Sequence, residues 1–307
     1  MSLDDRRALQ ALEIRLRVIL PEEYQDSYED LQPVSMGSAS LKYGADGRVA
    51  WNDIWATFCD LAMAGGPPHK GTLLEPGARV QIDAQSGLYD QVTGEICRGV
   101  SMVTDLEARL SPTPGWVRVA CLSEGMAGWL LRAIVMENVA ARADRAMLDL
   151  PAAPHFRLEK EIKNVVTVIA KTCHYWIGHL PRAQQLAIAD MFSSMGSESP
   201  LLEPALSSDD WPDDTLNTIS TTMAGIIEAD TGLRASGPRY TGWLGVECPS
   251  VRAAVWMMRA LVVNNVLSRR EGTVLFVPVS PAEDPDGEVV ARTLVRIHTL
   301  AALRGVL

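Results

Sequence analysis

The segment Gly115–Pro151, GWVRVACLSEGMAGWLLRAIVMENVAARADRAMLDLP, recurs without a gap as Gly242–Pro278, GWLGVECPSVRAAVWMMRALVVNNVLSRREGTVLFVP. Of the 37 aligned positions, 15 are identical, whereas ordinary amino-acid usage gives roughly two or three identities by chance. Two of the identical pairs are tryptophans, which are rare residues. The sequence therefore predicts an internal duplication.

Each copy of the duplicated segment predicts the order strand, helix, strand. Residues 116–121 and 243–248 are short runs typical of strands, and 124–142 and 251–269 have helical composition. A second strand then ends at a proline in each copy. A helical connection of this length is what parallel neighbouring strands require, so we expect parallel pairing with a right-handed crossover.

Apolar residues at helical spacing extend the pattern upstream. They predict a helix within 88–110 in the first copy and within 215–233 in the second, and 51–64 and 162–178 are further helical candidates. The predicted fold class is α/β, helix-rich and internally duplicated, with two related halves in the order helix, helix, strand, helix, strand. A ferredoxin-like fold, with antiparallel strands added from segments such as Arg79–Asp83, is the alternative.

The duplication also divides the chain. Residues 1–39 are expected to form an N-terminal helix and lead-in, and residues 281–307 a linker and a C-terminal helix. Between them, residues 40–152 make the first half and residues 153–280 the second, with the boundary at the proline-rich step after Pro151.

Composition restricts the class of function. The net charge of −10 and the pI near 5.0 oppose attraction to nucleic acid or to an anionic membrane. The N-terminus has no apolar core of signal-peptide length, and no run reaches about 18 uncharged apolar residues, so we expect a cytoplasmic protein without a membrane partner. Five widely spaced cysteines without a CxxC pair indicate neither disulfides nor a zinc ribbon.

Four retained residues, Cys121, Ser123, Cys248 and Ser250, stand where a predicted strand leads into a helix. Free backbone N–H groups and the helix dipole at such a place can bind a carboxylate or a phosphate. The alternative is structural, with each serine capping its helix and each cysteine buried. We treat these four residues as candidate ligand-binding residues.

The retained arginines Arg132 and Arg259 lie in the middle of apolar predicted helices. A buried arginine needs a protein carboxylate, backbone carbonyls or an anionic ligand. Arg132 and Arg259 therefore join the candidate ligand-binding set, with pairing inside the protein as the alternative.

A loop present in only one copy carries the candidate catalytic residues. The sequence Gly65-Gly66-Pro67-Pro68-His69-Lys70-Gly71 places His69 and Lys70 on a segment of glycines and prolines that can present a proton carrier and a cation to a ligand. The alternative is a turn that ends a helix, with both side chains at the surface.

A metal site is not expected. Cys173, His174 and His179 form the one close Cys/His group in the sequence, but on an α-helix residues 174 and 179 lie about 140° apart and do not share a face. No HExxH, GxSxG, GxGxxG or EF-hand motif occurs.

Three hypotheses of function follow. The first is a binding or accessory protein that holds a small anionic metabolite or cofactor between or within the two halves. The second is an enzyme with an asymmetric site at His69 and Lys70, and the third is a structural subunit of an oligomer, which the many tryptophans suggest. The residues indicate no particular cofactor, assign the chain to no family, and leave open whether it is an enzyme and whether it forms a homo-oligomer.

Overall fold

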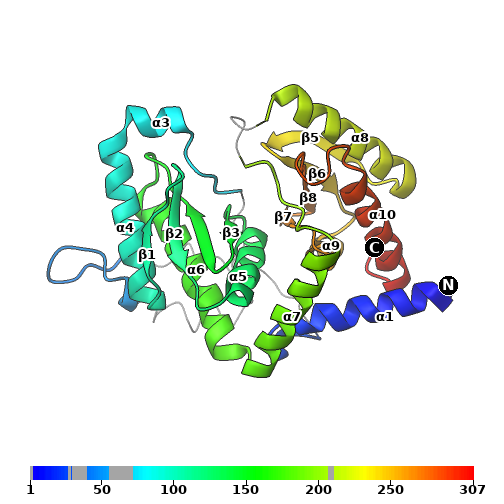
Figure 1. Cartoon of the computed structure of the whole chain (residues 1–307), viewed down its shortest axis with the longest axis horizontal. Coiled ribbons are helices and arrows are strands. Elements are labelled where there is room, and N and C mark those ends of the chain that lie inside the picture. Colours follow the sequence, from blue (N-terminus) through cyan, green and yellow to red (C-terminus); the bar gives the residue numbers. More distant parts are fainter. Residues whose placement is uncertain (1–2, 27–28, 30–39, 55–71, 207–210) are drawn as a thin grey trace. The chain divides into compact units, whose positions relative to one another are not determined.

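The computed structural model describes residues 3–26, 29, 40–54, 72–206 and 211–307. Contacts within the chain define two compact units, and Figure 1 colours them along the sequence. Unit 1 consists of Met1–Asp30 together with Asp190–Leu307, and unit 2 of Leu31–Ala189. These contact-defined units differ in extent from the halves 40–152 and 153–280, which sequence similarity defines. Each unit is described by itself.

Unit 2 contains a four-stranded sheet in the order β1-β2-β4-β3, in which all neighbours are antiparallel. Helices precede, interrupt and follow the strands. In chain order the elements are α3 (Arg79–Ala84), α4 (Ser86–Thr104), β1 (Ala108–Leu110), β2 (Trp116–Ala120), α5 (Glu124–Met136), β3 (Arg142–Asp144), β4 (Met147–Pro151), the π-helix η3 (Leu158–Ile162), α6 (Lys163–His174), the π-helix η4 (Tyr175–His179) and the first residues of α7 (Arg182–Glu198).

Unit 1 contains a second antiparallel sheet, β5-β6-β8-β7, with the same order of strands along the chain. An N-terminal helix and a C-terminal helix add to it. The elements are α1 (Leu3–Val18), the 3-10 helix η1 (Glu22–Tyr24), the end of α7, α8 (Asp213–Thr231), β5 (Ala235–Tyr240), β6 (Trp243–Glu247), α9 (Val251–Val262), β7 (Arg269–Glu271), β8 (Val274–Pro278) and α10 (Glu288–Arg304).

The expected parallel pairing of the two strands in each copy is wrong. After α5 the chain turns at Asn138, whose φ is 61°, and it forms β3 before it reaches β4. A tight turn with Arg145 at φ 52° reverses the chain between these strands. β4 therefore runs antiparallel to β2, and unit 1 repeats this path with Asn265 at φ 61° and Gly272 at φ 59°.

The ferredoxin-like alternative named the wrong additional strand. Arg79–Asp83 lies in helix α3, whereas the edge strand next to β2 is β1, over Ala108–Leu110. The helices expected within 88–110 and 215–233 are present as α4 and α8, and the leading and closing helices are present as α1 and α10.

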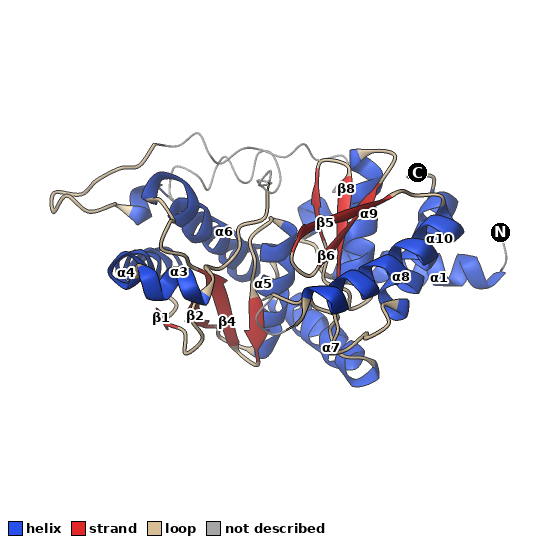
Figure 2. Cartoon of the chain, turned by 90° about the horizontal axis from the view of Figure 1, so that it is seen from above, coloured by secondary structure: helices blue, strands red, loops and turns tan. Residues whose placement is uncertain are grey.

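The sheet of unit 2 separates its side chains by alternation along each strand. Val117 and Val119 on β2 pair with Leu150 and Leu148 on β4, and all four are fully buried. Helices α4 and α5 contact the sheet, and α6 packs against both of them, so the helices gather on one side of the strands (Figure 2). The corresponding helices α8 and α9 contact the sheet of unit 1, and α10 packs against both.

The other face of the unit 2 sheet carries a charged group. Asp149 on β4 is almost fully buried and accepts two hydrogen bonds from Arg118 on β2, at 2.7 and 2.9 Å. Arg142 on β3 donates another at 3.0 Å and lies over the ring of Trp116 at 4.7 Å. The hydroxyl of Ser111 completes the group at 3.2 Å. Buried charge is therefore paired across three strands, as burial requires.

The helix that follows β4 changes its hydrogen bonding near its end. α6 ends at His174, and the π-helix Tyr175–His179 continues it, closing with a bond from Leu180 N to Tyr175 O of 3.1 Å. In this wider turn each bond spans five residues. The inference that His174 and His179 cannot share a face assumes an α-helix and is wrong, because their rings lie 4.9 Å apart.

None of the helices in the described parts of the chain is both long enough and apolar enough to cross a membrane.

Candidate functional site

The serines retained in both copies cap helices. The hydroxyl of Ser123 accepts a hydrogen bond from Met126 N at 3.1 Å, and that of Ser250 accepts one from Ala253 N at 3.0 Å. This is the N-cap arrangement, in which a side-chain oxygen satisfies a free N–H group of the first turn. Each hydroxyl therefore already bonds to its own helix.

The retained cysteines are neutral thiols. Burial raises the pKa of both Cys121 and Cys248 to about 12, and a thiolate is the form that attacks electrophiles or binds metals. Neither cysteine lines the pocket described below. Cys248 is a small buried residue at a strand end, and Cys121 is a partly buried one.

The retained arginines are buried in their helices, with exposed fractions of 6% for Arg132 and 8% for Arg259. The guanidinium of Arg132 donates to the carbonyl of Gly128, one turn earlier in the same helix, at 2.9 Å. Arg132, Cys121 and Ser123 belong to unit 2, and Arg259, Cys248 and Ser250 to unit 1. The structure thus places three of the six predicted ligand-binding residues in each unit. The candidate catalytic residues His69 and Lys70 lie outside the described residues.

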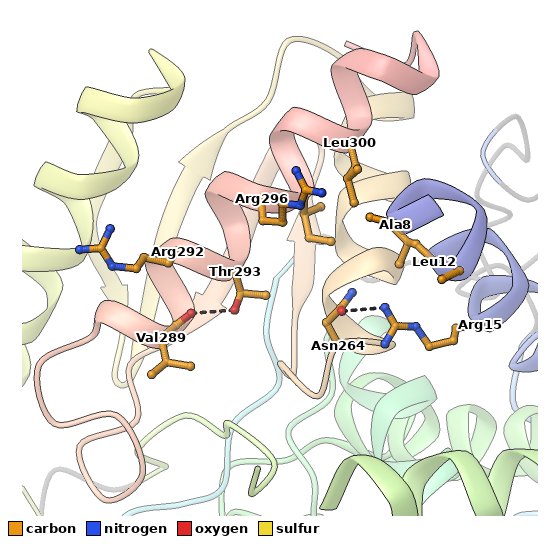
Figure 3. A pocket seen from close by; sticks show the side chains of 11 residues that line it. Ala8, Leu12, Arg15, Asn264, Val289, Arg292, Thr293, Arg296 and Leu300 are labelled. Atoms are coloured by element: carbon orange, nitrogen blue, oxygen red, sulfur yellow. Dashed lines mark hydrogen bonds between the residues drawn. The ribbon is translucent and has the colours of Figure 1, made fainter. Parts of the chain in front are cut away.

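A pocket of about 550 Å³ lies in unit 1, between α1, α10 and the turn after α9 (Figure 3). Ala8 and Leu12 on α1 face Leu300 on α10 across it, and Ile297 of α10 also lines it. The remaining lining residues are two apolar and five polar ones: Ala11, Val289, Arg15, Asn264, Arg292, Thr293 and Arg296. The described lining combines an apolar floor with arginines, and it contains no carboxylate.

Arg15 is the arginine that reaches from α1 toward the turn after α9. Its Nη2 donates to Oδ1 of Asn264 at 2.9 Å. Burial lowers the pKa of Arg15, and the carboxylate of Glu198 acts in the opposite direction, but a guanidinium stays charged throughout the physiological range. Its Nε is buried and has no hydrogen-bond partner among the described residues. Arg15 therefore brings a partly desolvated positive charge to the pocket wall.

The other two arginines come from α10 and are more exposed. Arg296 bonds to Asp5 at 2.8 Å, with side chains 46% and 27% exposed. Arg292 pairs with Glu288 at 3.1 Å in its own helix, and its guanidinium points away from Arg15 in Figure 3. Exposed pairs of this kind contribute little to stability. Arg296 can therefore exchange its partner for a bound anion at small cost.

Position 264, which lines the pocket in unit 1, carries a different residue type from the aligned position 137 in unit 2. Asn264 stands at the residue aligned with Glu137, and Glu137 is occupied by a buried ion pair with Lys171 of α6 at 2.7 Å. In unit 1 the neutral amide of Asn264 takes the place of that carboxylate and meets Arg15 instead. In unit 2 the charge of Lys171 is thus neutralised by Glu137. In unit 1 the uncharged amide of Asn264 does not neutralise the charge of Arg15.

Sequence reasoning missed this pocket because it sorted residues by their retention in both copies. Arg15 and Arg296 belong to the leading and closing helices, which have no place in the aligned segment. The available signal was the spacing of Arg292 and Arg296, which lie four residues apart and so share a helix face. Among the described residues, no group of three or more His, Cys, Asp or Glu side chains is arranged to hold a metal ion.

Comparison of the chain with known protein families, with curated protein sequences and with solved structures finds no match.

Proposed function

We propose that this chain binds a small anionic molecule that has an apolar part, and that the pocket of unit 1 holds it. The observation that carries the proposal is the pair Arg15 and Arg296 above an apolar floor, in a described lining without a carboxylate. An anionic head group near the arginines and a hydrocarbon part against Leu12 and Ile297 match that distribution of charge and apolar surface. Arginine also suits carboxylate and phosphate geometry.

The size of the pocket supports a metabolite rather than a macromolecule. Ligand pockets have volumes of about 300–1,000 Å³ and combine apolar walls with a few polar groups, and this pocket has about 550 Å³. Its described polar groups are guanidinium, amide and hydroxyl. These groups bind and orient a ligand, whereas general acid–base catalysis draws mostly on His, Glu, Asp, Lys, Tyr or Cys. The proposed role is therefore binding rather than catalysis.

The proposal includes a tandem duplication in which the two copies have diverged in function. Its support is the equal strand order of the two sheets, together with positive φ at positions 105, 115, 138 and 145 and again at 232, 242, 265 and 272. All four pairs are separated by 127 residues, the offset of the sequence repeat. In this scheme the ligand lies between one copy, at the turn with Asn264, and the helices α1 and α10, which belong to neither copy.

Hexanoate is a suitable probe, with hexanol as its uncharged counterpart. We expect hexanoate to bind in isothermal titration calorimetry and hexanol to bind at least tenfold more weakly, because hexanol has no charge for the arginines. The variants Arg15→Gln and Arg296→Gln should each weaken hexanoate binding about tenfold, the equivalent of about 1.4 kcal/mol. Arg182→Gln, an exposed arginine of α7 outside the pocket, is the control and should leave binding unchanged.

The proposal fails if hexanol and hexanoate bind equally, or if the double variant Arg15→Gln/Arg296→Gln keeps the affinity of the unmodified protein. Circular dichroism of each variant shows whether it is folded. Inorganic phosphate, titrated separately, distinguishes a site that needs the apolar part from one that takes the anion alone.

A further inference from the structure

The side chains of His174 and His179 meet in unit 2, whereas the pocket proposed above belongs to unit 1. Their Nε2 atoms are 3.1 Å apart, and their rings lie nearly edge to face at 62°. In this contact one ring nitrogen donates the hydrogen bond and the other accepts it. The two Nε2 atoms therefore face each other.

The π-helix is the cause of this meeting. It also places Tyr175, Trp176 and Leu180 in the interior together, with exposed fractions of 6%, 3% and 2%. Trp176 packs against Trp129 at 5.7 Å between ring centroids. Burial of three large side chains thus outweighs the regular hydrogen bonds of an α-helix.

The carbonyls released by the wider turn are held by a neighbouring helix. Nε2 of Gln185 donates to the carbonyl of Trp176 at 2.8 Å and to that of Leu180 at 3.0 Å. The π-helix is therefore fixed from outside, and with it the spacing of the two histidines. Such π-helical turns occur frequently at functional sites.

We propose that His174 and His179 form a two-histidine binding site for a divalent late transition-metal ion, with Cu²⁺ bound most strongly. Imidazole nitrogens bind such ions at about 2.0–2.1 Å, and two nitrogens 3.1 Å apart then subtend about 95–102° at the metal. That angle lies between the values of about 90° for tetragonal Cu²⁺ and about 109° for tetrahedral Zn²⁺. Water completes the coordination in this site.

The surroundings permit a cation. Lys171, one turn before His174, is the nearest positive side chain of α6, and its ion pair with Glu137 neutralises it. Both histidines are only partly buried, so a metal ion can reach them from solvent. The ring of Tyr175 packs edge to face against that of His179, with 5.5 Å between the centroids.

The test is a titration of the full chain with CuSO₄, followed by electron paramagnetic resonance. We expect one tightly bound Cu²⁺ per chain with hyperfine coupling to two imidazole nitrogens. His174→Gln and His179→Gln should each reduce the coupling to one nitrogen and weaken binding at least tenfold, because removal of even an outer-shell partner costs about 10–100-fold. His155→Gln is the control, since His155 is exposed and lies outside this pair.

A positioning variant separates a built site from casual binding by surface histidines. Gln185→Ala leaves both ligands in place and removes the hydrogen bonds that fix the π-helix. It should weaken Cu²⁺ and Zn²⁺ binding several-fold while circular dichroism stays unchanged. Identical Cu²⁺ affinity in the unmodified protein and in the double variant His174→Gln/His179→Gln would overturn the proposal, as would spectra of the unmodified protein with a single imidazole nitrogen. The hexanoate experiment reports on unit 1 and does not depend on this outcome.

Discussion

Replacement of Lys171 by methionine is expected to destabilise unit 2 strongly. The Lys171 side chain is 2% exposed, and its ammonium group bonds to the carboxylate of Glu137, 7% exposed, at 2.7 Å. Methionine is close in length to lysine without its charge, so the variant leaves Glu137 buried without its cation. Breaking a buried pair on one side costs about 3–5 kcal/mol. The double variant Lys171→Met/Glu137→Met removes both charges and should recover most of this loss.

Urea denaturation, followed by tryptophan fluorescence, measures the effect. Trp129 and Trp176 pack together on α5 and in the π-helix after α6, and they report on unit 2. With a slope of about 2 kcal/mol per molar urea, a loss of 4 kcal/mol, the middle of the range above, lowers the midpoint by about 2 M. Glu137→Asn is a useful companion because asparagine occupies the aligned position 264. A midpoint shift below about 0.5 M for Lys171→Met would refute the reasoning, since it would mean that Glu137 is solvated or protonated at little cost.

Three further outcomes are expected. Burial alone would raise the pKa of Asp149, but hydrogen bonds from Arg118 and Arg142 outweigh it and hold the pKa below its ordinary value of 3.8. The stability that this pairing adds is therefore present above pH 3.8 and is lost as the pH falls through the folded-state pKa. Acid unfolding monitored by circular dichroism should lose this component in the variant Asp149→Asn. That variant should also be less stable by about 1–3 kcal/mol at neutral pH in urea denaturation. Gly272 has a φ of 59°, so Gly272→Arg should lower the free energy of unfolding by about 1 kcal/mol. Arg145→Gly at the aligned turn should not lower it. A loss of stability in Arg145→Gly would contradict the argument that positive φ favours glycine at these two turns.

The sequence predicted the helices of this fold well and the short strands poorly. α4, α5, α8 and α9 carry many apolar residues at helical spacing, and that signal is local. β3 has three residues, Arg142–Asp144, without apolar alternation, and it exists because Asn138 and Arg145 adopt positive φ and allow a reversal on either side. Without that hairpin, the helical connection alone favoured parallel pairing. The direction of β4 thus depends on two backbone conformations that composition does not reveal.

The candidate sites show a similar limit. The alternative in which the repeated serines cap helices needs only residues three positions apart, so the sequence contained it. The pocket of unit 1 needs Arg15, which most of the chain separates from Asn264 and Arg296, and the three meet only through the packing of α1 and α10 on α9. The histidine pair needs a π-helix, which depends on the burial of Trp176 and Leu180. Long-range packing decided each of these sites.

The aligned arginines Arg142 and Arg269 have different partners in the two units. In unit 2, Arg142 pairs with Asp149 on the neighbouring strand. In unit 1 the residue aligned with Asp149 is Phe276, and Arg269 lies 4.0 Å from the centroid of that ring, fully buried and paired with Glu271 of its own strand at 2.8 Å. Each arginine thus has a carboxylate partner, but from a different position, because a buried guanidinium must have a counter-charge. Position 264 is different: there an amide stands where the aligned position 137 has a carboxylate, and that is the position where the proposed anion site opens.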